Sequence, residues 1–196
     1  MNLPNKLTLL RILLVPVFLV CMYCNFSWHF TIALILYAVA SITDALDGKI
    51  ARKYNLITTF GKFADPLADK ILVLAAFAAL ADTTAYSFPV NGIVITIIAA
   101  REFMVSGLRL VTAEKGVVVA AGIWGKLKTA FTMMAIAMML VWLAAWECFS
   151  NGSDAWFAAG GVMNIVFQIL VWISVLLTII SGGIYLKGYW KYIDMK

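Results

Sequence analysis

Residues 41–70 read SITDALDGKIARKYNLITTFGKFADPLADK and join two apolar stretches, 29–48 and 66–81. The segment carries four aspartates, which are Asp44, Asp47, Asp65 and Asp69. A charged group inside an apolar helix costs about 2.5–3.5 kcal/mol even on a lenient insertion scale. Four of them at the ends of two apolar stretches therefore require a compensating partner, and the rest of the chain has to fold around that requirement.

The composition places the chain in a lipid bilayer. Of its 196 residues, 64% are hydrophobic, whereas a soluble domain is nearer half apolar. A helix needs roughly 20 residues to cross the apolar layer. Six stretches are candidates: 7–27, 29–48, 66–81, 89–112, 127–147 and 162–186. The third is short unless it extends toward Gly61. We predict an all-α integral membrane protein with six transmembrane helices in a single domain, 1–196.

The basic residues indicate the orientation. All Lys and Arg residues fall within 6–11, 49–70, 101–128 and 187–196, and the connections 24–29, 82–92 and 147–160 contain none. Six spans put every basic group on one side, which by the positive-inside rule is the cytosol. Both termini are then cytosolic. We expect Lys6 and Arg11 to extend from the first helix to that surface.

The first two aspartates lie on one stripe of a helix. Residues separated by three, four, seven or eight positions share a helix face. Counted from Asp44, that face holds Asp47, Gly48, Ala51 and Arg52. The small residues let a bulky group approach the backbone, and the Arg52 guanidinium can bind a phosphate with two hydrogen bonds. The stripe is suited to a phosphorylated ligand.

The second pair repeats the arrangement. Gly61, Asp65 and Asp69 are spaced four residues apart and share a face, and Pro66 suits the first turn of a helix. Two antiparallel helices would thus turn four carboxylates toward each other near the cytosolic end.

Carboxylates gathered in this way repel one another unless a cation holds them. Mg²⁺ or Mn²⁺ suits oxygen ligands that also bind phosphates, and the lack of clustered His or Cys makes zinc a poor fit. The alternative is that the aspartates only solvate helix ends. That explains one or two carboxylates well, but it explains four aligned with glycines and Arg52 poorly.

The pattern Asp44-x-x-Asp47-Gly48-x-x-Ala51-Arg52, then eight residues, then Gly61-x-x-x-Asp65-x-x-x-Asp69 resembles the signature of the CDP-alcohol phosphatidyltransferases. Every fixed position is present. Members of this family transfer a phosphatidyl group from a CDP-linked lipid to an alcohol and release CMP. The resemblance implies that the four aspartates coordinate Mg²⁺ or Mn²⁺ and that Asp69 is also the catalytic base.

The resemblance also implies a binding site for the CDP-lipid. The residues it assigns there are Asn5, Thr8, Gly48, Arg52, Thr58 and Gly61. For Asn5 and Thr8 an alternative stays open, because polar residues at the start of the first span can instead cap its helix.

A second basic group points to the acceptor alcohol. Arg101 and Arg109 are eight residues apart on one face, and Lys126 and Lys128 open the fifth stretch. Together they suit an acceptor that carries its own phosphate, although Lys128 also fits ordinary positive-inside charge. Residues 5–11, 61–70, 100–109 and 125–129 resemble the bacterial branch of the family that uses sn-glycerol 3-phosphate and CDP-diacylglycerol.

The resemblance further implies a homodimer in a bacterial inner membrane, surrounded by lipids, with its active site facing the cytosol and no nucleic-acid partner. Three alternatives remain. The first is the same chemistry with phosphatidylglycerol, inositol phosphate or serine as acceptor. The second is a small cation transporter, since intramembrane carboxylates often line ion pathways. The third, a structural subunit, leaves the aspartate alignment unexplained.

Overall fold

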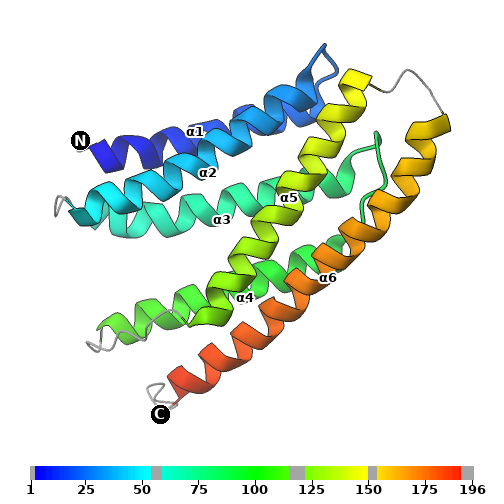
Figure 1. The fold of residues 1–196 in the computed structure, drawn as a ribbon. Helices are drawn as coiled ribbons and strands as arrows, with labels where there is room; N and C mark the ends of the chain where they lie inside the picture. The colour runs from blue at the N-terminus through cyan, green and yellow to red at the C-terminus, as the bar shows by residue number, and fades with distance from the viewer. Residues whose placement is uncertain (1–2, 54–58, 115–121, 150–153, 191–196) are drawn as a thin grey trace.

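The computed structural model (Figure 1) describes the backbone of residues 3–53, 59–114, 122–149 and 154–190, and the side chains of residues 5–44, 64, 66–112, 122–149 and 159–190. Within these residues the chain forms six α-helices: α1 (Leu3–Tyr23), α2 (His29–Lys53), α3 (Thr59–Asp82), α4 (Gly92–Glu114), α5 (Ile123–Phe149) and α6 (Asp154–Trp190). The predicted all-α class is confirmed for this part of the chain.

Three of the helices are long and apolar enough to cross a membrane, judged on the described residues. They contain the segments Asn5–Tyr23, Ile123–Phe149 and Ala159–Trp190, and α2 adds a shorter apolar segment, His29–Asp44. The helices α3 and α4 have charged residues in their middle turns, which dilute their apolar runs. Each predicted stretch corresponds to one helix, while the crossing of the membrane by all six stays a prediction.

Helix α3 begins earlier than the proline suggests. We expected Pro66 in the first turn of a helix, but α3 starts at Thr59 and Pro66 lies inside it. A proline removes one backbone N–H from the helix, and membrane helices tolerate that loss where neighbouring groups bind the freed carbonyls. Within the same helix, Lys70 Nζ donates a hydrogen bond of 2.8 Å to the Pro66 carbonyl. The early start places Asp65 and Asp69 well inside α3.

The helices pack as two connected groups. Helix α1 lies against α2 and α3, α6 lies against α4 and α5, and α5 crosses over to α2 (Figure 1). The core between them is apolar and includes Phe18, Phe77, Met139 and Phe167, each at most 1% exposed. Large apolar side chains such as Trp172 and Leu176 are exposed on α6, as expected for a surface that contacts lipid tails.

Hydrogen bonds between elements fix the end of the bundle where α1 meets α2. Glu147 of α5 accepts hydrogen bonds from the backbone N–H of Thr31 at 3.1 Å and from its hydroxyl at 3.2 Å. A carboxylate at this place satisfies one of the free N–H groups in the first turn of α2 and interacts favourably with the helix dipole. The neighbouring His29 has its Nδ1 atom 3.0 Å from the Cys21 carbonyl oxygen.

An aromatic cluster joins the α3–α4 connection to α5 and α6 at the same end. The ring of Phe167 has its centroid 6.1 Å from Tyr86, 5.4 Å from Phe88 and 6.3 Å from Trp142. The Tyr86 hydroxyl donates a hydrogen bond of 2.5 Å to the Gly160 carbonyl. Burial raises the pKa of the Tyr86 phenol, so the hydroxyl keeps its proton for this bond.

The aromatic cluster predicts a stability effect. Replacing Phe167 with Ala leaves a cavity among three other rings, and such truncations cost about 3–5 kcal/mol in close-packed cores. We expect Phe167→Ala to lower the thermal denaturation midpoint of the detergent-solubilised protein markedly. The matched control is Phe149→Ala, because Phe149 is 67% exposed at the end of α5. Equal midpoints for the two variants would contradict the assigned packing.

Candidate active site

Two of the four predicted aspartates have described side chains, and they come from different helices. Asp44 lies on α2 and Asp69 on α3, both are partly buried, and the charge of Asp44 acts on Asp69. Asp47 and Asp65 belong to the same two helices, but their side chains lie outside the described residues. The structure therefore brings together one carboxylate from each predicted stripe.

Helix α1 supplies a buried cation to this group. The Arg11 side chain is 0% exposed, and its Nη1 lies 2.7 Å from Oδ1 of Asp44, whose side chain is 34% exposed. Our expectation that Arg11 extends to the membrane surface is therefore wrong. A guanidinium in an apolar interior requires an opposite charge, and the nearby carboxylate of α2 provides it more favourably than a long reach to water.

Asn5 and Thr8 are buried near the start of α1. Asn5 is 8% exposed and Thr8 is 0% exposed. Because α1 already begins at Leu3, neither residue occupies the capping position before the helix, and the capping alternative is wrong. Both side chains have polar partners, and they precede Arg11 on the same helix.

The structure describes the remaining residues assigned to the CDP-lipid site only in part. Gly48 and Arg52 lie in the last turns of α2, and Gly61 lies in the first turn of α3. Their surroundings, and Thr58 altogether, lie outside the described residues.

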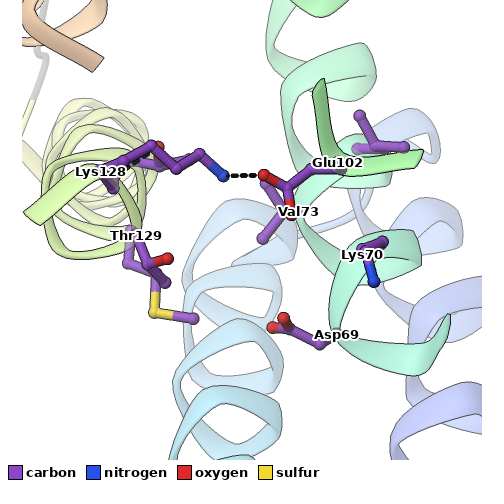
Figure 2. A pocket seen from close by; sticks show the side chains of 9 residues that line it. Asp69, Lys70, Val73, Glu102, Lys128 and Thr129 are labelled. Atoms are coloured by element: carbon purple, nitrogen blue, oxygen red, sulfur yellow. Dashed lines mark hydrogen bonds and ion pairs between the residues drawn. The ribbon is translucent and has the colours of Figure 1, made fainter. Parts of the chain in front are cut away.

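Asp69 borders a small cavity between α3, α4 and α5 (Figure 2). Its volume is about 20 Å³, and it is lined by Asp69, Lys70, Val73, Leu74, Glu102, Lys128, Thr129, Thr132 and Met133. A cavity that holds one water molecule has a volume of about 10–15 Å³ when it is measured in the same way. This cavity therefore has the size of a water molecule or an ion. In Figure 2 the Asp69 carboxylate points into this space, below the pair formed by Lys128 and Glu102.

Glu102 connects two of the predicted acceptor-binding cations. Its Oε1 accepts a hydrogen bond of 2.5 Å from Lys128 Nζ and one of 3.0 Å from Arg101 Nη1. The side chains are 15% exposed for Glu102, 12% for Arg101 and 4% for Lys128. Lys128 is thus a buried, paired cation and not a solvated positive-inside charge.

The Arg101 side chain is positioned by α6. Its guanidinium carbon lies 5.4 Å from the ring centroid of Tyr185, a distance at which the ring face attracts a cation. The Arg101 stem packs against Gly182, where an added Cβ would be 3.2 Å from Arg101 Cγ. A larger residue at this position would therefore crowd the Arg101 stem, and its side chain would have to shift slightly.

The other two predicted cations are placed differently. Arg109 is exposed on α4, and its charge acts on Lys70 at the cavity. Lys126 is exposed on α5 and does not line the cavity.

Glu102 is the residue that our sequence reasoning missed. It is the one acidic residue in the stretch 89–112, directly after Arg101. An ionisable residue within an apolar stretch is by default a candidate for function, and that signal was available. Its contact with Lys128 was not, because the two residues belong to different helices.

Comparisons with known proteins identify the family of this chain. The sequence profile of the CDP-alcohol phosphatidyltransferases matches residues 1–180. The chain belongs to the CDP-alcohol phosphatidyltransferase family. Among its relatives is a CDP-diacylglycerol–glycerol-3-phosphate 3-phosphatidyltransferase of Bacillus subtilis, which is 40% identical over 203 residues, covering 97% of this chain and 96% of the relative.

Two further relatives carry the same name. The Rickettsia felis protein is 40% identical over 191 residues, with 97% of each chain covered. The Salmonella typhimurium protein is 40% identical over 141 residues, covering 71% of this chain and 76% of the relative.

The described part of the site suits a CDP-alcohol phosphatidyltransferase that uses a hard divalent ion. Among described side chains no three His, Cys, Asp or Glu residues gather closely enough to form a metal site, but only two of the family's four aspartates are in that set. Those two are oxygen donors from two different helices, and the charge of Asp44 acts on Asp69. Carboxylate oxygens are the donors that Mg²⁺ and Mn²⁺ prefer. The residues present therefore fit such an ion.

The contact between Arg11 and Asp44 predicts a difference between two aspartate variants. Asp44→Asn removes the charge opposite the buried Arg11, whereas Asp69→Asn does not. We expect Asp44→Asn to lower the free energy of unfolding by about 2–3 kcal/mol, less than the loss of a fully buried pair because Asp44 is partly exposed. Thermal denaturation in detergent with EDTA measures this without a contribution from metal. A midpoint for Asp44→Asn at or above that of Asp69→Asn would contradict it.

Proposed function

We propose that this protein transfers the phosphatidyl group of CDP-diacylglycerol to sn-glycerol 3-phosphate, forming phosphatidylglycerophosphate and CMP in phospholipid biosynthesis. Relatives named for this reaction match nearly the whole chain at 40% identity. The structural observation that carries the proposal is the cavity, where the Asp69 carboxylate lies near the cations Lys70 and Lys128. A carboxylate can accept the proton of an alcohol, and cations can bind the phosphate that the same acceptor carries.

In the proposed reaction, Asp69 accepts the proton of the hydroxyl group that attacks the CDP-lipid. A hydroxyl oxygen of sn-glycerol 3-phosphate attacks the phosphorus atom that carries the lipid. The bond from this phosphorus to CMP breaks, CMP leaves with the electron pair, and the proton of the hydroxyl moves to Asp69. The position of Asp69 suits this role, because its carboxylate borders the cavity where a hydroxyl could approach it.

We further propose that Asp44, Asp47, Asp65 and Asp69 hold one or two Mg²⁺ or Mn²⁺ ions. The bound ion would supply Lewis-acid polarisation of the phosphoryl oxygens and stabilise the charge on departing CMP. The chain's own contribution is to hold the carboxylates in place, and the Arg11 guanidinium does so for Asp44.

The CDP-lipid would bind along α1, α2 and the start of α3. The residues proposed to contact it are Asn5, Thr8, Gly48, Arg52, Thr58 and Gly61. The burial of Asn5 and Thr8 in α1, beside the helix that carries the first aspartates, supports this assignment.

The proposed setting is a bacterial inner membrane, with six spans, both termini in the cytosol and the site open to the cytosol. The segregation of Lys and Arg to one set of connections supports it. We also propose a homodimer, since the exposed apolar side chains of α6 offer a surface for either lipid or a second copy.

An acceptor screen tests the proposed reaction. Purified protein with CDP-diacylglycerol and Mg²⁺ should release CMP rapidly with sn-glycerol 3-phosphate. Phosphatidylglycerol, inositol phosphate and serine should give at most about one hundredth of that rate, because none presents the same alcohol and phosphate together. Faster CMP release with one of these three would assign the protein a different acceptor. No release with any alcohol, together with cation flux in proteoliposomes, would favour the transporter alternative.

The proton-accepting role predicts the effect of a single atom exchange. Asp69→Asn keeps the size of the side chain but removes its basicity, and loss of a general base typically costs about 10²–10⁴-fold in rate. We expect CMP release to fall by at least about 10²-fold with the protein still folded. EDTA should stop the wild-type reaction, and Mg²⁺ or Mn²⁺ should restore it.

The control is Asp82→Asn, the same change at the last residue of α3, where Asp82 is exposed. It should leave the rate unchanged. Unaltered turnover in Asp69→Asn would remove the base assignment, and full activity in EDTA would remove the metal assignment.

A further inference from the structure

Arg101 and Lys128 direct their charged groups to a single atom. Arg101 extends from α4 and Lys128 from α5, and both donate to Oε1 of Glu102, at 3.0 Å and 2.5 Å. Two cations that converge on one oxygen atom make an anion-binding site. In this structure the anion is a carboxylate of the chain itself.

Neither cation can easily turn away from this point. The Lys128 side chain is 4% exposed, and Arg101 lies over Tyr185 with its stem against Gly182. A buried cation without an opposite charge is strongly unfavourable, so the two cations favour an anion at this point. Exchange of one anion for another is therefore easier here than loss of the anion.

The location of the site matches one part of the proposed acceptor. Glu102 and Lys128 line the same cavity as Asp69, which is the proposed proton acceptor for the alcohol. In Figure 2 the Asp69 carboxylate lies on one side of this cavity and the Lys128–Glu102 contact on another. The cavity is too small for the acceptor while the Glu102 carboxylate occupies its edge. Once that carboxylate is displaced, an acceptor whose hydroxyl faces Asp69 would have its phosphate close to the two cations.

We propose that Glu102 is an internal substitute for the acceptor's phosphate. It holds Arg101 and Lys128 together while the acceptor is absent, and a phosphate monoester takes its place when the acceptor binds. The identity of that monoester as sn-glycerol 3-phosphate rests on the proposed function. The substitution itself rests on the contacts of Glu102 alone.

This role would contribute to acceptor selection. An uncharged alcohol offers nothing to exchange for the carboxylate, so Glu102 keeps the two cations and the alcohol gains no contact with them. A phosphate dianion carries more negative charge than the carboxylate and offers several acceptor oxygens to the same donors. Glu102 thus disfavours the binding of an uncharged alcohol and leaves the two cations available to an alcohol that carries a phosphate.

The test is the binding of phosphate to a variant without this negative charge. Glu102→Gln keeps the shape of the side chain and one oxygen that can accept from the cations. We expect it to bind inorganic phosphate and sn-glycerol 3-phosphate about tenfold more tightly than the wild type, because it no longer competes for or repels the dianion. Isothermal titration of the full-length protein in detergent gives both dissociation constants, and glycerol serves as the uncharged probe.

The matched control is Glu147→Gln, the same change at the opposite end of the bundle, where Glu147 binds Thr31. Its phosphate affinity should equal that of the wild type. If Glu102 instead positions the cations for the acceptor, or only stabilises the fold, Glu102→Gln binds phosphate equally or more weakly, and the proposal is overturned.

Glu102→Asp serves as a second variant should Glu102→Gln fail to fold. Its side chain is one methylene shorter, so its contacts with the two cations are weaker and it should also bind phosphate more tightly than the wild type. Equal or weaker binding overturns the proposal in the same way.

The two proposals can fail separately. Tighter phosphate binding by Glu102→Gln, without CMP release from the wild type and sn-glycerol 3-phosphate, would refute the proposed function and leave the role of Glu102 intact. Normal CMP release by the wild type, together with unaltered phosphate binding in Glu102→Gln, would refute the role of Glu102 and leave the proposed function intact.

Discussion

Pairing of buried charges between helices is the constraint on which this bundle depends. Arg11 of α1 binds Asp44 of α2, and Glu102 of α4 binds Lys128 of α5. In an apolar surrounding each of these charges is unfavourable alone, so the helices have to meet where the opposite charges face each other. Apolar packing is less selective, because lipid tails are as apolar as the side chains they would replace. The ion pairs therefore contribute to specifying which helices become neighbours.

The same pairs surround the proposed chemistry. Asp69 is carried by α3, which lies against α1 and α4 and also contacts α5. The charges of Asp44 and Glu102 both act on it, one from each pair. A change in either pair therefore alters the electrostatic surroundings of Asp69. In this protein the contacts that hold the helices together and the contacts that prepare the site are largely the same.

Much of the fold could be predicted from the sequence, because the length and polarity of a membrane helix are properties of a single segment. The six apolar stretches each correspond to a helix. The two aspartate stripes indicated that carboxylates of α2 and α3 come close together, and the charge of Asp44 does act on Asp69. The family followed from the motif 44–69 and is confirmed by the match over residues 1–180. Helix ends were less accurate, as Pro66 illustrates: α3 starts at Thr59, because a membrane helix can contain a proline in its interior.

The partners of the charges could not be predicted. Arg11 near the start of an apolar stretch fits a surface cation by every local criterion, and only the position of α2 makes it a buried partner of Asp44. The contact of Glu102 with Lys128 likewise depends on how α4 and α5 cross.

The two ends of the bundle are held by different kinds of bond. At the end away from Asp69, Thr31 binds Glu147 and Tyr86 binds the Gly160 carbonyl, so backbone groups take part in both contacts. Each of these contacts joins a side chain to the backbone of another element, whereas the ion pairs near Asp69 join two side chains. A backbone group moves only with its helix, so the contacts at the far end tie one helix directly to the next. The Asp69 end is therefore the end where a charged group can exchange its partner while every helix keeps its place.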